Sequence, residues 1–503
     1  MDQTELVEFL SDPSTHGSDA PVEVITTHSA HVFLVGDIAY KIKRAVKYNY
    51  LDFTAPETRR DIIKHEHNLN APAAPRIYDR VVAITREPSG ELALEGSGEP
   101  IEYALRMHRF PREAELTWIA DAGNLTIEIA EKLGTTTGRY HAAAETRTAD
   151  GAVLIKEIVE ELHEAFTGMK ATLGHDRLAE YFARTGRMFE RVASLLTERT
   201  KQGFVRRCHG DLHLKNLVMI NGEPVPFDAL EFDERLGTCD VAYDLAFLVM
   251  DLLHRDLDNQ ANVVLNSYLR TTTDFAGLAA MPLFLSIRAA IRSMVAVQTM
   301  SGSVSEEIAE DARNYLDQAT RFLTPAPPRL VAVGGVSGTG KTTVSAMIAP
   351  ILGPAPGAVH LRSDLERKAL FGVDPLEKLP DDAYAPDVNE KVYARVLSHA
   401  EEILRAHHSV IVDATFLAEE QSAAIRALAE RSAAAFDGIW LSADPDILAR
   451  RVADRTGDAS DADVAVLRKQ LDRQKKPALW QEIDAGGDPE TVFALVEACL
   501  FTV

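Results

Sequence analysis

The sequence contains little cysteine, no long apolar run, and fewer basic than acidic residues. Its three cysteines, Cys208, Cys239 and Cys499, show no paired spacing among 503 residues, which argues against a disulfide framework and against a zinc site. No apolar run reaches the length of a membrane span, and the N-terminus lacks the basic and apolar regions of a signal peptide. We therefore expect a cytoplasmic protein without a membrane partner.

The excess of acidic over basic residues argues against nucleic acid and anionic lipid as partners. Lysine and arginine total 53 against 76 acidic residues, which gives a formal net charge of −23. Such a surface repels nucleic acid and anionic lipid, so we expect small-molecule ligands and no nucleic acid. A chain of 503 residues is too long to form a single hydrophobic core, so we expect two or three domains. No pattern in the sequence specifies an oligomeric state.

A polar segment near the middle of the chain contains the residue types that phosphoryl transfer needs. It reads His209-Gly-Asp211-Leu-His-Leu-Lys-Asn216, and an apolar strand that ends in Asp228 follows. Kinases use one carboxylate to orient the attacking hydroxyl, and an amide and a second carboxylate to hold magnesium. Asp211 is therefore the candidate catalytic base, and Asn216 and Asp228 are candidate magnesium ligands. The turn signal at residues 221–222, Asn-Gly, brings the second strand back beside the first.

A lysine upstream completes this candidate nucleotide site. The predicted strand at residues 38–43 places Lys41 and Lys43 on one face, because strand side chains alternate with a period of two. A lysine on such a strand reaches the nucleotide phosphates when a glutamate from the next helix holds it, and we choose Glu66 from the helix predicted at 55–70. We favour Lys41 over Lys43. The usual glycine-rich flap is missing, since residues 28–36 hold one glycine.

A proline-rich segment separates this region from a second nucleotide site. Residues 324–328, Thr-Pro-Ala-Pro-Pro, cannot be helical and predict a semi-rigid linker. We therefore expect a kinase-like domain at 1–323, with a small lobe at 1–110 and a helical lobe at 111–323, and a P-loop domain at 329–503.

The P-loop domain begins with an apolar strand at residues 330–334 and a complete G-x-x-x-x-G-K-T motif. The glycines allow backbone N–H groups to cradle phosphate oxygens at a helix N-terminus. Lys341 neutralises phosphate charge, and the hydroxyl of Thr342 binds magnesium. The nucleotide-binding candidates are Gly335, Ser337, Gly338, Thr339, Gly340, Lys341, Thr342 and Thr343.

Further residues of this domain indicate a kinase. Asp364 follows a second predicted strand and is the candidate that orients the acceptor hydroxyl, although a helix N-cap is the alternative. Arg367 and Lys368, a turn further on, are expected to contact anionic groups of the substrate. Asp413 ends an apolar strand and is a candidate magnesium ligand. Arg451 and Arg455 lie one helical turn apart, where they could close over the γ-phosphate, or simply form a solvated helix end. Because no Asn-Lys-x-Asp signature for guanine is present, ATP is the expected nucleotide.

The His-Gly-Asp-x-x-x-x-Asn loop resembles the aminoglycoside phosphotransferase branch of the protein-kinase-like fold. With the P-loop and the segment at 455–463, the whole chain is similar to bacterial proteins in which such a domain is fused to a gluconate-kinase-like ATP-binding domain. The resemblance implies an α+β bilobal kinase-like domain followed by an α/β P-loop kinase domain. It also implies that Asp211 is the base, that Asn216 and Asp228 bind metal, and that Lys41 binds phosphate.

We therefore predict a tandem kinase that uses ATP and Mg2+ at two sites to phosphorylate hydroxyl groups of a sugar, polyol or aminoglycoside-like metabolite. Two alternatives stay open: the first domain is a regulatory or binding module beside a catalytic P-loop domain, or the P-loop domain is an ATP-driven switch. A protein kinase is less favoured, because no Ala-Pro-Glu segment follows Asp228.

Overall fold

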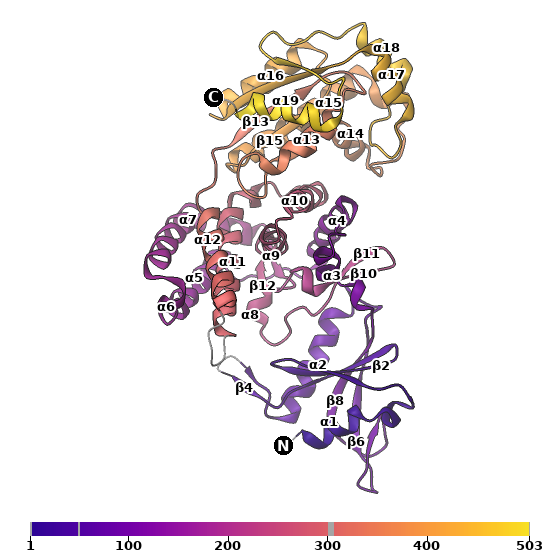
Figure 1. Ribbon diagram of the computed structural model, residues 1–503, viewed down its shortest axis with the longest axis vertical. Coiled ribbons are helices and arrows are strands. Elements are labelled where there is room, and N and C mark those ends of the chain that lie inside the picture. Colours follow the sequence, from indigo (N-terminus) through magenta and orange to yellow (C-terminus); the bar gives the residue numbers. More distant parts are fainter. Residues whose placement is uncertain (1–2, 49–50, 300–305, 502–503) are drawn as a thin grey trace. The chain divides into compact units, whose positions relative to one another are not determined.

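The computed structural model describes residues 3–48, 51–299 and 306–501, and the chain divides into two compact units. Unit 1 consists of Met1–Leu154 and Leu195–Asp251, and unit 2 consists of Ile155–Ser194 and Leu252–Val503. Unit 1 thus contains the predicted small lobe together with the catalytic segment, and unit 2 contains most of the remaining helices and the P-loop region (Figure 1). The domain boundaries at 323 and 329 remain predictions.

Unit 1 is built on an antiparallel six-stranded sheet in the order β1-β2-β3-β8-β6-β7. The strands are β1 (Glu23–Thr26), β2 (Ala30–Val35), β3 (Ile38–Lys43), β6 (Tyr78–Arg86), β7 (Leu92–Leu94) and β8 (Glu99–His108). Alternating side chains such as Phe33, Ile42 and Val82 form a core with helix α1 (Thr4–Ser11). Helix α2 (Pro56–Asn70) begins with proline in its first turn and packs through Ile63 near Leu105 of β8.

The segment at 209–216, which holds the candidate base Asp211, lies between two small antiparallel ladders of unit 1. Strand β9 (Val205–Arg207) pairs with β12 (Thr238–Asp240), and β10 (Leu217–Ile220) pairs with β11 (Glu223–Pro226). Asn221 and Gly222 have φ values of 53° and 78°, as a two-residue hairpin turn with the twist of its strands requires. The Asn-Gly signal therefore predicted this hairpin correctly.

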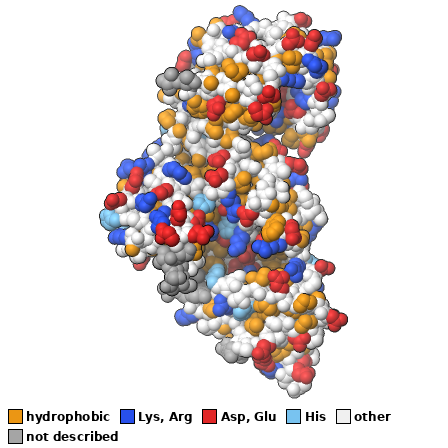
Figure 2. Space-filling model, in the orientation of Figure 1, with side chains coloured by type: hydrophobic (Ala, Val, Ile, Leu, Met, Phe, Trp, Pro, Cys, Tyr) orange, Lys and Arg blue, Asp and Glu red, His pale blue; other side chains and the backbone are white. Residues whose placement is uncertain are grey.

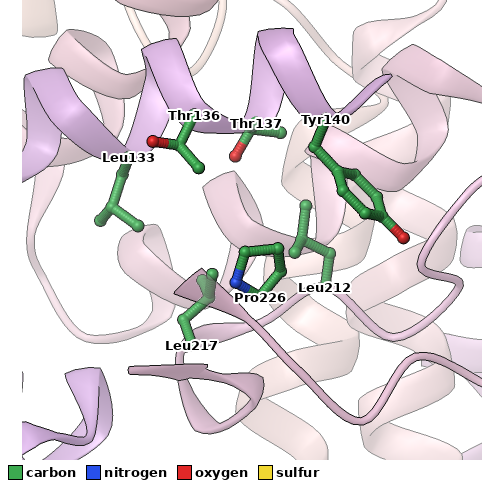
Figure 3. A pocket seen from close by; sticks show the side chains of 7 residues that line it. All are labelled: Leu133, Thr136, Thr137, Tyr140, Leu212, Leu217 and Pro226. Atoms are coloured by element: carbon green, nitrogen blue, oxygen red, sulfur yellow. The ribbon is translucent and has the colours of Figure 1, made fainter. Parts of the chain in front are cut away.

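Helix α4 (Ile127–Ala143) covers the β10–β11 hairpin. Figure 3 shows the seam between them, which is lined by Leu133, Thr136, Thr137, Tyr140, Leu212, Leu217 and Pro226. The seam encloses no space large enough for a water molecule. It is therefore packed core between α4, the hairpin and Leu212 of the loop at 209–216.

Unit 2 contains a five-stranded parallel sheet in the order β14-β15-β13-β16-β17. The strands are β13 (Arg329–Gly334), β14 (Val359–Arg362), β15 (Val410–Asp413), β16 (Ala435–Ser442) and β17 (Gln481–Asp484). Consecutive residues of β13, such as Leu330 and Val331, point to opposite faces of the sheet and are both fully buried. This burial explains the continuous apolar run in the sequence, because helices cover both faces of a parallel sheet.

Most of the remaining elements are helical. In the part of the chain that the structure describes, the helices not yet named are α3 (Leu116–Asp121), α5 (Gly151–Thr167), α6 (Lys170–Leu173), α7 (His175–Lys201), α8 (Glu234–Gly237), α9 (Val241–His254), α10 (Asp258–Thr272), α11 (Met281–Gln298), α12 (Glu306–Phe322), α13 (Lys341–Ile348), α14 (Ser363–Phe371), α15 (Pro386–Arg405), α16 (Glu419–Arg431), α17 (Pro445–Asp454), α18 (Val464–Leu471) and α19 (Pro489–Phe501). Two short strands, β4 (Lys47–Tyr48) and β5 (Leu51–Asp52), pair with each other. Among the described residues, none of these helices combines the length and apolarity needed to cross a bilayer.

On the face of the molecule seen in Figure 2, acidic and basic side chains are interspersed. The net charge of −23 is therefore not gathered into one acidic surface on that face.

Within unit 2, helix α10 satisfies backbone groups at the edge strand of the parallel sheet. The Asn262 side chain donates to the carbonyls of Pro356 and Ala358 at 3.2 and 3.0 Å, and the Asn266 side chain accepts from the N–H of His360 at 2.7 Å. An open sheet edge presents unpaired polar groups, and buried ones must find partners. Residues before the proline-rich segment thus complete the edge of the P-loop sheet.

We expect Asn262→Ala to lower the free energy of unfolding by about 1–3 kcal/mol, because it removes the donor of the buried Pro356 carbonyl and one of the two donors of the Ala358 carbonyl. Urea-induced unfolding followed by circular dichroism measures the change. Asn259→Ala is the matched control, since this asparagine is exposed on the same helix, and it should alter the value by less than about 0.5 kcal/mol. Equal stability of the two variants would mean that the contact contributes nothing.

Candidate active sites

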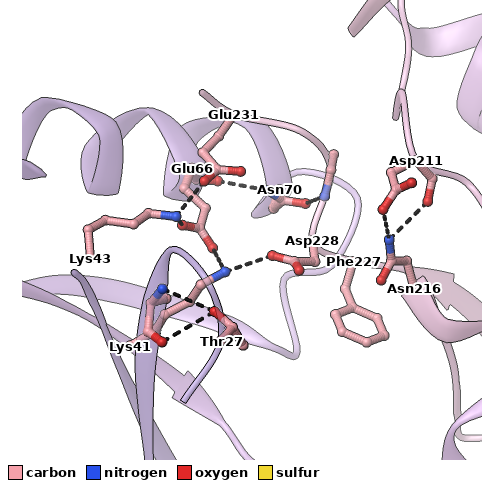
Figure 4. A network of polar contacts seen from close by, with 12 residues as sticks. Thr27, Lys41, Lys43, Glu66, Asn70, Asp211, Asn216, Phe227, Asp228 and Glu231 are labelled. Carbon is pink, nitrogen blue, oxygen red and sulfur yellow. Dashed lines mark hydrogen bonds and ion pairs between the residues drawn. The ribbon is translucent and has the colours of Figure 1, made fainter. Parts of the chain in front are cut away.

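Unit 1 brings the predicted lysine, glutamate and metal-binding aspartate into direct contact (Figure 4). The Lys41 ammonium on β3 donates to Glu66 of α2 and to Asp228, both at 2.7 Å. Burial opposes the charge on Lys41, but Asp228 and Glu66 outweigh it and raise the lysine pKa well above its ordinary value. Lys41 is therefore positively charged throughout the physiological range, as a phosphate-binding lysine must be.

The second lysine of the same strand is more deeply buried. Lys43 contacts the other oxygen of Glu66 at 2.7 Å and also binds Glu231. Its side chain is 1% exposed, whereas Lys41 is 13% exposed. A ligand from solvent can reach the more exposed lysine, which supports the choice of Lys41 as the phosphate-binding residue.

The catalytic loop holds Asp211 and Asn216 together. The Asn216 Nδ2 donates to the backbone oxygen and to the Oδ2 of Asp211, both at 2.9 Å. His209 contributes from within the loop, because its Nε2 lies 2.9 Å from the carbonyl oxygen of Phe227, next to Asp228. The imidazole thus connects the catalytic loop to the segment that carries the predicted metal ligand.

A buried aspartate that we did not predict as a site residue supports the loop. Asp244 on α9 accepts from the backbone N–H groups of His209 at 3.0 Å and Gly210 at 2.9 Å. Gly210 has a φ of 83°, which favours glycine. The turn before Asp211 is therefore held by a carboxylate from α9, which lies 34 residues beyond Gly210 in the chain.

The donor atoms around this loop suit a hard divalent cation. Magnesium prefers oxygen ligands from carboxylates and amides. The Nδ2 of Asn216 is occupied by Asp211, so the amide oxygen is the atom that can face a metal. Asp228 has a left-handed φ of 60°, and its side chain is 44% exposed. Such strain in a non-glycine residue persists where the surroundings impose it, commonly at functional sites.

In unit 2, the P-loop has the conformation that its glycines predict. Gly335, Gly338 and Gly340 all have positive φ, and a Cβ at Gly335 would lie 2.5 Å from the carbonyl oxygen of Leu441. Lys341 begins α13, and its ammonium donates to the Val336 carbonyl of the loop at 3.0 Å. The loop therefore already surrounds the lysine that is predicted to bind phosphate.

The magnesium candidates of this domain lie next to each other. The Thr342 hydroxyl donates to Asp413 Oδ2 at 2.6 Å, and His360 Nε2 is 3.5 Å from the same oxygen. Burial opposes ionisation of Asp413, but the contact with His360 and the charge of Lys341 outweigh it and lower the aspartate pKa to about 2. Asp413 is therefore a permanent carboxylate, as a metal ligand requires.

Asp364 lies at the same edge of the sheet. It occupies the first turn of α14, directly after β14, and the register pairs Arg362 of that strand with Asp413. Open parallel sheets bind ligands at the carboxyl ends of their strands. Burial and the neighbouring charge of Asp413 raise the pKa of Asp364 above its ordinary value. Pairs of titratable groups whose environments shift their pKa values apart commonly occur at acid/base sites, so the geometry is compatible with the predicted role of Asp364.

The structure places the two arginines of the predicted lid on backbone carbonyls. Arg451 on α17 donates to Ala485 and Gly487 at 2.7 Å, so it ties this helix to the loop after β17. Arg455 caps the C-terminus of α17 and donates to the Ala462 carbonyl at 2.7 Å. It also lines an open cavity of about 350 Å3 beside residues 460–464. Their action on the γ-phosphate remains a prediction.

Two contacts of this lid region could not be read from local patterns. Gln470 of α18 accepts from the Ser337 N–H of the P-loop at 2.7 Å. Asp461 binds Lys368 of α14 at 2.7 Å and accepts from the Tyr384 hydroxyl at 2.6 Å. The segment at 455–471 is therefore fastened both to the P-loop and to the side of the sheet that carries Asp364.

The chain is similar to one protein over most of its length and to several others over part of it. A family model described as an AAA domain matches residues 330–477. An uncharacterized protein of Mycobacterium tuberculosis is 29% identical over 484 residues, which covers 94% of each chain. A gluconokinase from Sinorhizobium meliloti is similar at 22% identity over 35% of this chain and 98% of its own, with a TM-score of 0.25. A choline/ethanolamine kinase family protein from Mesorhizobium loti is similar at 11% identity over 63% of this chain and 96% of its own, with a TM-score of 0.38.

The expected fold class is confirmed. An antiparallel sheet with helices makes the N-terminal region α+β, and the C-terminal region is an α/β P-loop fold, whose parallel sheet carries the nucleotide motif at the end of β13.

Proposed function

We propose that the protein is a tandem ATP-dependent kinase, in which each domain transfers the γ-phosphoryl group of Mg-ATP to a hydroxyl group of a small metabolite. Sugars, polyols and aminoglycoside-like compounds are the acceptors that this chemistry suits. The observation that carries the proposal is a shared arrangement: in both regions a proposed metal-binding acid neighbours a proposed phosphate lysine, and a candidate base lies on an adjoining segment, which in the first region is linked to that acid's segment through His209. The members are Asp211, Asp228 and Lys41 in one region and Asp364, Asp413 and Lys341 in the other.

The proposed step is an in-line displacement. Asp211 or Asp364 orients the acceptor hydroxyl and takes its proton as the oxygen attacks the γ-phosphorus. The bond from the γ-phosphorus to the bridging oxygen breaks, and ADP leaves with the electron pair. Lys41 and Lys341 neutralise phosphate charge, and bound magnesium would neutralise the charge that develops between the β- and γ-phosphates. Catalysis rests on positioning and charge neutralisation, without a covalent enzyme intermediate.

Magnesium would be held by Asn216 and Asp228 in the first region. In the second, Thr342 and Asp413 would hold it. The proposed domain limits are 1–323 and 329–503, joined by the linker at 324–328.

Transfer of radiolabel from γ-labelled ATP to a pool of sugars, polyols and aminoglycosides tests the proposal. We expect two labelled products from the wild-type chain, of which Asp228→Ala removes one and Lys341→Ala removes the other. A single product that disappears only in Lys341→Ala would show that the P-loop domain is the only catalyst and that the first domain is regulatory. ATP hydrolysis without any labelled product, abolished by Lys341→Ala, would favour an ATP-driven switch.

A further inference from the structure

The loop at 228–231 in unit 1, which carries the proposed metal ligand Asp228, is joined to strand β3 by two ion pairs (Figure 4). Only one of these pairs involves groups that are proposed to bind nucleotide or metal. Lys41 binds Asp228, and Lys43 binds Glu231, which lies three residues further along the same loop. Glu66 contacts both lysines, with one oxygen 2.7 Å from each ammonium. Two ammonium groups thus face three carboxylates, so the cluster carries a formal charge of −1.

The two ion pairs differ in what nucleotide binding would do to them. Lys41 has to contact phosphate, and Asp228 has to offer its carboxylate to magnesium, so their mutual contact must loosen when both ligands enter. The side chains of Lys43 and Glu231 are 1% and 7% exposed. A ligand cannot reach them, and their contact can persist when the other opens.

The loop that carries these acids needs such a support. Asp228 has a left-handed φ of 60°, a conformation that costs a non-glycine residue energy and requires the surroundings to hold it. Its N–H donates to the Tyr78 hydroxyl, and the N–H of Ala229 donates to Asn70 Oδ1, both at 2.9 Å. Glu231 adds a charged tether from the other end of the loop to the strand that carries Lys41.

We propose that the Lys43–Glu231 ion pair is a permanent clamp that positions Asp228 for the metal, whereas the Lys41–Asp228 ion pair is exchanged for nucleotide and metal. Lys43 and Glu231 are therefore positioning residues that touch neither ligand. This inference rests on the proposed function, because it takes Asp228 to be a metal ligand.

Binding of Mn2+ in the presence of AMP-PNP, followed by electron paramagnetic resonance of free Mn2+, tests the clamp without measuring turnover. All proteins are the full chain with Lys341→Ala, and Asp228→Asn in this background defines the signal of the first site. Glu231→Gln keeps the shape and an oxygen for Lys43 but removes the charge. We expect it to weaken Mn2+ binding about tenfold, the lower end of the range for partners that orient metal ligands.

Three comparisons separate a clamp from general damage. Lys43→Met should weaken Mn2+ binding to a similar extent, and a double variant with Glu231→Gln should be no weaker than the worse single one, because a pair that acts as a unit is not additive. Lys41→Met should instead weaken AMP-PNP binding and, when Mn2+ is titrated without nucleotide, leave Mn2+ binding as tight or tighter, since it frees Asp228. Glu95→Gln, which removes a half-exposed partner of Arg80 in the same lobe, should change neither.

The outcomes are distinguishable. If Asp228→Asn abolishes the first-site signal but Glu231→Gln binds Mn2+ as its parent does, the clamp is overturned and the proposed function survives. If Asp228→Asn itself retains the signal, the assignment of the metal site fails, and the clamp fails with it. If Glu231→Gln does not fold, Glu231→Asp replaces it: the shorter side chain keeps the charge, and parent-like Mn2+ affinity would again contradict a geometric clamp.

Discussion

Asp211→Asn is expected to lower phosphoryl transfer at the first site by about a thousandfold, within the range of about 100- to 10,000-fold for a general base. Asparagine cannot take the proton of the acceptor hydroxyl. In the wild-type chain Asn216 Nδ2 donates to Asp211 at 2.9 Å. The asparagine oxygen can accept the same hydrogen bond, so the loop and the nucleotide site should stay intact. The loss should therefore appear in kcat, while the affinity for ATP changes by less than about threefold.

The measurement uses a chain that also carries Lys341→Ala, so that only the first site turns over. Single-turnover transfer of label gives the chemical rate, and calorimetry with AMP-PNP gives the affinity. Asp61→Asn removes an exposed carboxylate on α2 and is the matched control with the wild-type rate. A loss below tenfold in Asp211→Asn would mean that this carboxylate does not take the proton.

Local sequence rules succeeded where the geometry depends on neighbouring residues. The Asn221-Gly222 turn, the alternation along β3 and the glycines of the P-loop each depend on steric limits within a few residues. These limits fixed which side chains share a strand face and where the chain turns. The proximity of Asp211, Asn216 and Asp228 follows from the same rules, because a single hairpin separates the loop from the metal-binding segment.

The contacts that sequence reasoning missed join distant parts of the chain. Lys43 and Glu231 are 188 residues apart, Ser337 and Gln470 are 133 apart, and Lys368 and Asp461 are 93 apart. No periodicity connects such positions. Their contact depends on how separate elements pack, which a single sequence does not reveal.

The basic residues after Asp364 show a different limit. The sequence suggests that Arg367 and Lys368 bind anionic groups of the substrate. In the structure Arg367 donates to the Ala383 carbonyl and to Asn389 Oδ1, both at 2.7 Å, and Lys368 binds Asp461. The same donors suit a substrate anion and a protein carboxylate, so residue type alone does not distinguish the two roles. In this structure the two side chains organise the segment around Asp364.

Asp364→Asn is expected to lower transfer at the P-loop site by about a hundred- to a thousandfold and to change its pH dependence. Burial and the charge of Asp413 raise the pKa of Asp364 above its ordinary 3.8. A protonated carboxyl cannot take a proton, so the wild-type rate is present above this raised pKa and is lost as the pH falls through it. Asp413, with a pKa of about 2, stays ionised over the same range and does not contribute to the fall.

The acid limb of the pH–rate profile should therefore belong to Asp364 alone. Its measurement uses a chain with Asp211→Asn, which silences the first site, between pH 4 and pH 8. The residual rate of Asp364→Asn should lose this limb, whereas Asp387→Asn, which removes an exposed carboxylate on α15, should retain both the rate and the limb. An unchanged limb in Asp364→Asn would assign the titration to another group and leave Asp364 as a helix-terminal acid. A base requires that the acid limb disappear together with most of the rate. If the carboxylate only stabilised the helix, its loss would lower the rate by the same factor at every pH, and the acid limb would remain.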